Sequence, residues 1–249
     1  MRVRCTQCGA DLEVAADARL LRCGYCDTAL VVDGSATLFH EVLVPTVGPA
    51  DVAGHLHRFF ASPAAAAGLE KEATVETPSF EFFPFWAFTV RDDGGERVIL
   101  EPAAPSALQG LQGLTLPAGT SRQISTDVTG DHPVIDPEVP PSTARTWMLD
   151  REPGIDIRRT VLTHVPLYRV AYRWRDRRWR AAVDGVSGRV FPADFPARAE
   201  TPFRAVAVAA LVVFGLEGLL IPNLFLKAAV YVVTAVPLLG LAWWTSRSA

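Results

Sequence analysis

The sequence predicts an α+β protein built from an N-terminal four-cysteine zinc ribbon, a central antiparallel-sheet α+β domain and a C-terminal two-helix transmembrane hairpin. Three observations lead to this expectation: all four cysteines lie within the first 26 residues, alternating aromatic segments fill the middle, and the C-terminal part is almost wholly apolar. We therefore expect the ribbon over residues 1–35, the α+β domain over 37–200 and the helical hairpin over 203–244.

The composition narrows the class of protein. The 249 residues are 49% hydrophobic and 20% charged, which fits neither a disordered chain nor one that crosses a bilayer throughout. A net charge of −3 gives no general attraction to nucleic acid. The first residues lead directly into the cysteine motif, so we expect no cleavable signal peptide. Without export, the cysteine thiols are expected to lie in a reducing compartment.

The four cysteines form two C-x2-C pairs, Cys5 with Cys8 and Cys23 with Cys26, separated by fourteen residues. Two thiolates three positions apart on a tight turn can face one ion, and two such turns complete a tetrahedron. We therefore expect one structural Zn²⁺ bound by these four residues. Four thiolate ligands leave no open position for water, which disfavours hydrolytic chemistry. Iron in a rubredoxin-like site is the alternative.

The local sequence fits a ribbon. Gly9 and Gly24 are expected to supply the positive φ of the two metal-binding turns. Residues 11–15 and 20–22 are predicted to form two short antiparallel strands. A domain of this size has too small a core to fold without a metal.

Two apolar runs, residues 203–221 and 224–244, are each long enough to cross a bilayer if helical. Arg198 and Arg204 lie at the start of the first run and Arg247 follows the second, whereas the turn between the runs carries no positive charge. This bias predicts a two-pass protein of the cytoplasmic membrane with both termini in the cytoplasm.

Two charged residues lie deeper inside these runs, Glu217 in the first and Lys227 in the second. Each lies five positions from residue 222, so a tight hairpin would place them at the same depth. We expect an intramembrane pair that offsets the cost of each charge, with a proton or ion path as the alternative.

Residues 38–47 are predicted to form a strand and residues 49–61 a helix. The histidines are scattered, and no second metal site or catalytic base with an orienting partner emerges from the sequence. They are His40, His55, His57, His132 and His164. We therefore expect no enzymatic activity and no catalytic residues.

Two segments, residues 79–100 and 164–192, are predicted to form related strand-hairpin units. Both run from a proline through aromatic and alternating residues to a turn and a return strand, with an offset of 82 residues. We interpret them as a weak internal repeat. Residues 101–145 are rich in Pro, Gly, Ser and Thr and give no clear prediction.

The second hairpin carries a candidate basic patch that faces lipid or a partner. Alternation places aromatic residues on one face of the strand and arginines on the other. The patch comprises Arg169, Arg173, Arg175, Arg178 and Arg180. Three interpretations are open: a solvated face paired with acidic residues, a surface near anionic lipid headgroups, or a nucleic-acid contact.

The order of these features resembles a group of bacterial membrane-anchored zinc-ribbon proteins, labelled after transcription-factor-type ribbons or as primosomal protein N′-like. Residues 83–86, Phe-Pro-Phe-Trp, match its aromatic "Y-x-P-F-W" strand. Residues 183–190 match its "V-N-G-x-T-G-x-V" segment, with Asp184 for Asn and Ser187 for Thr. The same segment of the group is matched by residues 166–168, 172–174 and 179.

Some members of this group are linked to membrane-stress systems with phage-shock-type or stomatin-like partners, and the group lacks a well-defined activity. The resemblance implies an adaptor or anchor. The helicase-related label rests on the ribbon alone and is not carried over to this chain.

We therefore expect a non-enzymatic membrane-anchored adaptor or scaffold that contacts membrane lipids. It would present its ribbon and α+β domain to an unidentified cytoplasmic or membrane protein partner, in a membrane-stress response. The alternative is a membrane-tethered nucleic-acid-binding zinc-ribbon protein, which the balanced charge of the ribbon disfavours. The sequence leaves the oligomeric state open.

Overall fold

The computed structural model describes residues 1–92, 94–106, 111, 114–198 and 201–248, and the side chains of 201–206 and 241–248 lie outside the description. The chain forms two compact units. The first comprises residues 1–59 and 73–195, and the second comprises residues 60–72 and 196–249.

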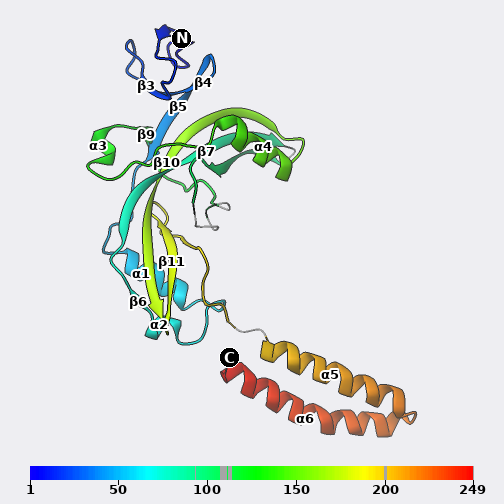
Figure 1. The fold of residues 1–249 in the computed structure, drawn as a ribbon. Coiled ribbons are helices and arrows are strands. Elements are labelled where there is room, and N and C mark those ends of the chain that lie inside the picture. Colours follow the sequence, from blue (N-terminus) through cyan, green and yellow to red (C-terminus); the bar gives the residue numbers. More distant parts are fainter. Residues whose placement is uncertain (93, 107–110, 112–113, 199–200, 249) are drawn as a thin grey trace. The chain divides into compact units, whose positions relative to one another are not determined.

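The first unit begins with two β-hairpins that hold the cysteines (Figure 1). They are formed by β1 (Arg2–Arg4) with β2 (Asp11–Glu13), and by β3 (Leu20–Arg22) with β4 (Ala29–Asp33). The predicted strands between the two cysteine pairs therefore exist, but each pairs with a strand outside that gap and not with the other. Each hairpin thus encloses one C-x2-C pair in its turn.

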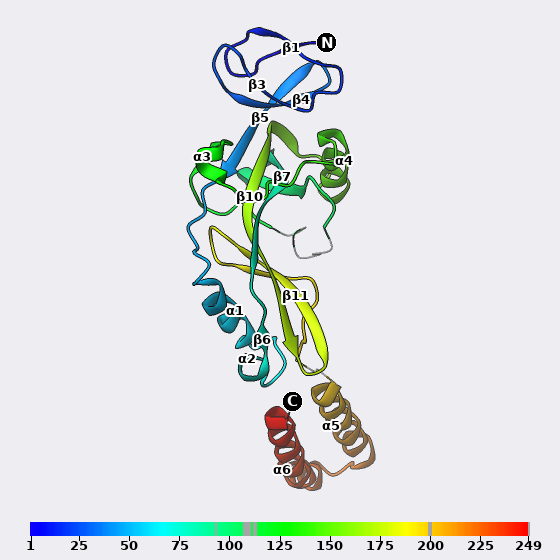
Figure 2. The ribbon, with the colours of Figure 1, turned by 60° about the vertical axis from the view of Figure 1, so that its left-hand side comes forward.

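A large mixed sheet continues from the second hairpin. Its strands are β5 (Ala36–Leu43), β6 (Thr74–Val75), β7 (Ser79–Asp92), β8 (Gly95–Pro102), β9 (Ser121–Gln123), β10 (Asp156–Trp174), β11 (Arg177–Asp184) and β12 (Val190–Pro192). The long strand β10 pairs with β7, β6 and β11 in antiparallel fashion and with β5 in parallel (Figure 2). Strand β4 joins β5, so the second ribbon hairpin belongs to this sheet.

The β7–β8 and β10–β11 hairpins have the same register. Asp92 lies opposite Gly95 across the first turn, and Trp174 lies opposite Arg177 across the second. Trp174 comes 82 residues after Asp92, and Arg177 comes 82 residues after Gly95. Phe83 of β7 lies opposite Val165 of β10, and these two residues are also 82 apart. The strand pairing is therefore symmetric about this pair, with each residue of the first hairpin matched by one 82 positions later in the second.

Strand β7 is buried on both faces, which explains its aromatic composition. Phe83 and Phe85 pack into one hydrophobic cluster, whereas Trp86 and Phe88 pack into another on the opposite side. Burial of each such side chain contributes about 2–3 kcal/mol to folding. The sequence alone did not indicate burial on both sides.

Helix α4 (Pro141–Arg151) contributes to the second of these clusters through Ala144 and Met148. The remaining helices of the first unit are α1 (Val52–Phe60), at the predicted position, and the single turn α3 (Thr126–Thr129). Helix α1 buries Val52 and Leu56, which are four positions apart and so lie on one face.

The second unit contains the single turn α2 (Leu69–Glu72) and two longer helices, α5 (Thr201–Leu220) and α6 (Leu224–Ser248). The two longer helices lie side by side and antiparallel (Figure 1). Between them, the Asn223 side-chain oxygen accepts hydrogen bonds from the backbone amides of Phe225 and Leu226 at 3.0 and 3.2 Å. This is an N-cap, and it fixes where α6 begins.

Among the described residues, no helix combines the length and apolar character needed to cross a membrane. The predicted transmembrane hairpin, and with it the two-pass location in the cytoplasmic membrane, is therefore wrong. The prediction rested on residues 203–221 and 224–244, and the side chains of 203–206 and 241–244 lie outside the description.

Candidate metal centre

The first C-x2-C pair lies on a tight turn held by two backbone hydrogen bonds. The amide of Gly9 donates to the carbonyl oxygen of Cys5 at 2.9 Å, and the amide of Cys5 donates to the carbonyl oxygen of Ala10 at 2.8 Å. Gly9 has φ +76°, the left-handed conformation that glycine adopts without strain. The predicted role of Gly9 is thus confirmed.

The second turn repeats this pattern eighteen positions later. Asp27 donates its amide to the carbonyl oxygen of Cys23, and the amide of Cys23 donates to the carbonyl oxygen of Thr28, both at 2.9 Å. The residue with positive φ is Asp27, at +56°, and not Gly24 as predicted. The position that matches Gly9 is the one after the second cysteine, and aspartate tolerates this conformation better than most residues.

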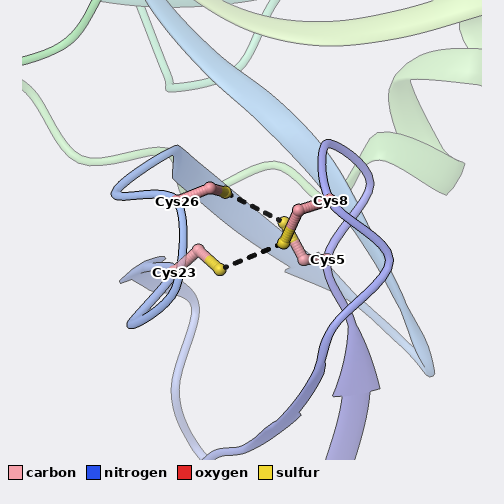
Figure 3. A group of neighbouring side chains, drawn as sticks. All are labelled: Cys5, Cys8, Cys23 and Cys26. Carbon is pink, nitrogen blue, oxygen red and sulfur yellow. Dashed lines mark hydrogen bonds between the residues drawn. The ribbon is translucent and has the colours of Figure 1, made fainter.

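The two turns bring the four sulfur atoms together (Figure 3). The Sγ atoms of Cys5 and Cys26 are 3.8 Å apart, those of Cys8 and Cys23 are 3.7 Å apart, and all four lie within 4.8 Å of one another. In a tetrahedral site with bonds of about 2.3 Å to sulfur, the ligand atoms are about 3.8 Å apart. The four cysteines are therefore positioned to hold one metal ion.

A hydroxyl group beside the cluster favours the thiolate form that a metal requires. The Thr28 Oγ1 atom lies 3.2 Å from the Cys26 sulfur. Hydrogen bonds from the hydroxyl and the backbone amide of Thr28 lower the pKa of Cys26 to about 6. Thr28 is itself buried. Cys26 is thus ready to ionise near neutral pH, whereas at Cys8 the lowering effect of the Ala10 backbone is outweighed by burial and hydrogen bonds with the other three cysteines, which raise the pKa of this thiol.

The cysteines also form part of a small hydrophobic core. Cys5 and Cys23 are buried and pack with Val3, Leu12 and Leu30. This core contains few large side chains, so it provides little of the free energy needed to fix the ribbon. A metal bound by four side chains would supply that free energy and would leave no coordination position for a substrate.

Thr37 on β5 joins the first turn to the large sheet. Its hydroxyl donates to the carbonyl oxygen of Arg4 at 2.9 Å and accepts from the amide of Thr6 at 3.0 Å. Because Thr37 is buried, removal of this hydroxyl would leave both backbone groups without a partner. The turn is therefore fixed both by its own backbone bonds and by β5.

The surface of the ribbon combines paired charges with one exposed aromatic side chain. Its ion pairs are Arg2 with Glu13, Arg4 with Asp11 and Arg22 with Asp27, at 3.2 to 3.5 Å. Tyr25 lies between the second pair of cysteines, and 77% of it is exposed. It borders an open hollow of about 720 Å³ that Leu12, Val14 and Leu21 also line.

The predicted basic patch lies on β10, β11 and the turn between them, and its arginines are largely paired. Register places Arg173 opposite Arg178, and the Glu76 carboxylate lies between them, 2.6 Å from Arg178 and 4.0 Å from Arg173. Arg169 forms an ion pair with Glu81. Arg175 stacks over the ring of Trp174 at 4.1 Å. These contacts fit a solvated sheet face paired with acidic residues, except at Arg180.

The structure brings together two histidines that the sequence analysis left apart. Parallel pairing of β5 with β10 places His40 beside His164, with Nε2 of His40 3.1 Å from Nδ1 of His164. Nε2 of His164 lies 2.9 Å from the carbonyl oxygen of Ile135, to which it donates a hydrogen. Both rings are buried. No local signal could reveal this contact, because 124 residues separate the two histidines.

Glu217 and Lys227 have partners other than each other. The Lys227 Nζ atom donates to the carbonyl oxygen of Gly218 at 2.8 Å, and the Thr234 hydroxyl donates to Glu217 at 3.2 Å. A direct Glu217–Lys227 ion pair is not found in the part of the chain that the structure describes. Both side chains nevertheless link α5 to α6.

Comparison with known proteins gives no relative: no family model, no curated protein and no solved structure matches this chain. Its class is therefore defined by its own fold and site. It is a mixed α+β protein with a large sheet and an N-terminal cluster of four cysteines that resembles a zinc ribbon.

Proposed function

We propose that this chain is a non-enzymatic adaptor whose ribbon holds one structural zinc ion and presents a docking surface to a protein partner. The observation that carries the proposal is the closed set of four cysteine sulfurs next to an exposed tyrosine. Zinc is the metal that four thiolates in tetrahedral geometry bind most commonly in structural sites. The resemblance to bacterial zinc-ribbon proteins without a defined activity supports the same role.

Tyr25 has the properties of a docking anchor. Its ring is 77% exposed, although its position is fixed at the tip of a turn that the metal would hold rigid. Tyrosine is enriched among residues that dominate binding energy at protein interfaces, because it buries a large area at a small entropic cost. The adjoining hollow, with the apolar side chains of Leu21 and Val14, offers room for a side chain of the partner.

The charges of the ribbon favour a protein partner over nucleic acid. A nucleic-acid site needs arginines that are free to contact phosphates. Of the four ribbon arginines, Arg2, Arg4 and Arg22 are each paired with an acidic side chain. This leaves Arg19 as a single exposed arginine and not a cluster. We therefore do not extend the proposal to nucleic acid.

A quantitative pull-down tests this function. The full chain with its metal serves as bait, beside the variants Tyr25→Ala and Trp147→Ala. Trp147 is a matched control because it is also an aromatic residue, 43% exposed, but lies on α4. We expect at least one protein that wild type and Trp147→Ala capture and that Tyr25→Ala captures about tenfold less. Equal capture by all three baits, or no protein above background, would contradict the proposal.

A further inference from the structure

A small hollow on the face of the β10–β11 hairpin is lined by three arginines. Arg169 comes from β10, and Arg178 and Arg180 come from β11. The segment before β7 contributes Glu76 and Thr77, and β7 contributes its first residue, Ser79; Thr77 and Ser79 bring hydroxyl groups. The volume of the hollow is about 210 Å³. It is separate from the cysteine cluster, which is formed by other strands.

The hydrogen bonds of two of these arginines leave donors unused. Arg178 binds Glu76 through Nε at 2.9 Å and Nη2 at 2.6 Å, which leaves its Nη1 group. Arg169 donates to Glu81 from Nε. A guanidinium group has five N–H donors in a planar fork, so both side chains keep hydrogens that an additional acceptor can take.

Arg180 differs from its neighbours. No ion pair or hydrogen bond of its guanidinium group occurs among the described residues, and its side chain is exposed. Register places it opposite Ala171, so no large side chain faces it across the strand pair. All five of its donors are available at the edge of the hollow.

The charge of this region has the sign and the size for a doubly charged anion. Its four arginines, counting Arg173 beside Glu76, stand against two carboxylates, those of Glu76 and Glu81, which gives a net charge of +2. A phosphomonoester carries a charge of about −1.5 to −2 at pH 7 and three strong acceptor oxygens. Planar guanidinium forks bind such groups with two parallel hydrogen bonds.

We propose that this hollow binds a phosphomonoester group, with Arg180 as the principal ligand and Arg169 and Arg178 as supporting donors. Glu76 has two opposing effects in this site. It holds Arg178 in place and separates it from Arg173, but its carboxylate repels the incoming anion. The proposal does not depend on the protein-docking function of the ribbon.

Isothermal titration of the full chain tests the site, with O-phosphoserine and inorganic phosphate as probes and a dinucleoside phosphodiester for comparison. We expect phosphoserine and inorganic phosphate both to bind, and lowering the pH from 7.5 to 5 to weaken binding as the phosphate group takes up a proton. The diester carries one charge and should bind much more weakly. A diester that binds as tightly as phosphoserine, or no binding of either phosphoserine or inorganic phosphate, would overturn the proposal.

Three variants assign the binding to these residues. Arg180→Gln removes an exposed, unpaired side chain and should weaken phosphoserine binding about tenfold while leaving the fold intact. Glu76→Gln removes the repelling carboxylate and should tighten binding several-fold. Arg158→Gln is the control, because Arg158 lies near the other end of β10 and pairs with Asp156. Unchanged affinity in Arg180→Gln, or an equal loss in Arg158→Gln, would refute the assignment.

Discussion

His40 and His164 form a buried polar contact where β5 meets β10. Burial and the charge of the neighbouring histidine lower the pKa of His40 to about 3, and burial lowers the pKa of His164 to about 4. Arg22 also lowers the pKa of His40, whereas Asp136 and the Ile135 carbonyl oppose the shift at His164. Both imidazoles are therefore neutral in the folded protein at neutral pH.

This pair should make the fold sensitive to acid. The folded-state pKa values lie below the usual 6.5, so the unfolded chain takes up protons first. The stabilisation is present above pH 6.5 and declines as the pH falls toward 4, by about 2 kcal/mol per imidazole at pH 5. His40→Gln should decrease the slope of unfolding free energy against pH, measured by denaturant titration.

His57→Gln is the matched control, because His57 is exposed on α1 and should leave the slope unchanged. Acid also displaces metal from thiolates, and both variants share that loss. The difference between the two variants is therefore the informative quantity. Identical slopes would show that the buried pair does not titrate on unfolding.

At the scale of single elements, the turn after β11 depends on one buried carboxylate. Asp184 accepts hydrogen bonds from the amides of Val186 at 2.9 Å and Ser187 at 3.2 Å. Gly188 completes the turn with φ +71°, and a Cβ atom there would overlap the ring of His55. These contacts explain why an acidic or amide residue and a glycine occupy this part of the sequence.

Asp184→Ala should destabilise the protein by about 2–3 kcal/mol, because it leaves two amides unpaired in a buried turn. Asp184→Asn keeps one side-chain acceptor and should cost about 1 kcal/mol. Guanidinium denaturation followed by near-UV circular dichroism measures both. An equal cost for the two variants would mean that the hydrogen bonds are not what stabilises the turn.

The sequence predicted those elements whose evidence is local. The C-x2-C pairs, helix α1 and the two aromatic hairpins follow from spacing, periodicity and turn residues. Helix α4 was missed because its residues are mostly polar and lie in a segment rich in proline. The parallel pairing of β5 with β10 was missed because nothing local encodes a contact across more than a hundred residues, and the histidine contact was missed with it.

On the scale of the whole molecule, the chain joins two units of different character. The first combines the four-cysteine cluster with a large sheet whose two hairpins are related by an offset of 82 residues. The second is rich in exposed apolar side chains, such as Leu219 and Phe225, which are 82% and 87% exposed. The two apolar runs were found from the sequence and both form helices, but neither qualifies as a membrane span among the described residues.

The central claim is that the four cysteines hold one metal ion that the ribbon needs. Metal analysis of the purified chain, combined with titration of its thiols, tests it most directly. We expect about one zinc ion per chain, four thiols that react only after a chelator removes the metal, and loss of the zinc in Cys8→Ser and Cys26→Ser. A folded wild-type chain with no bound metal and four freely reactive thiols would contradict the account.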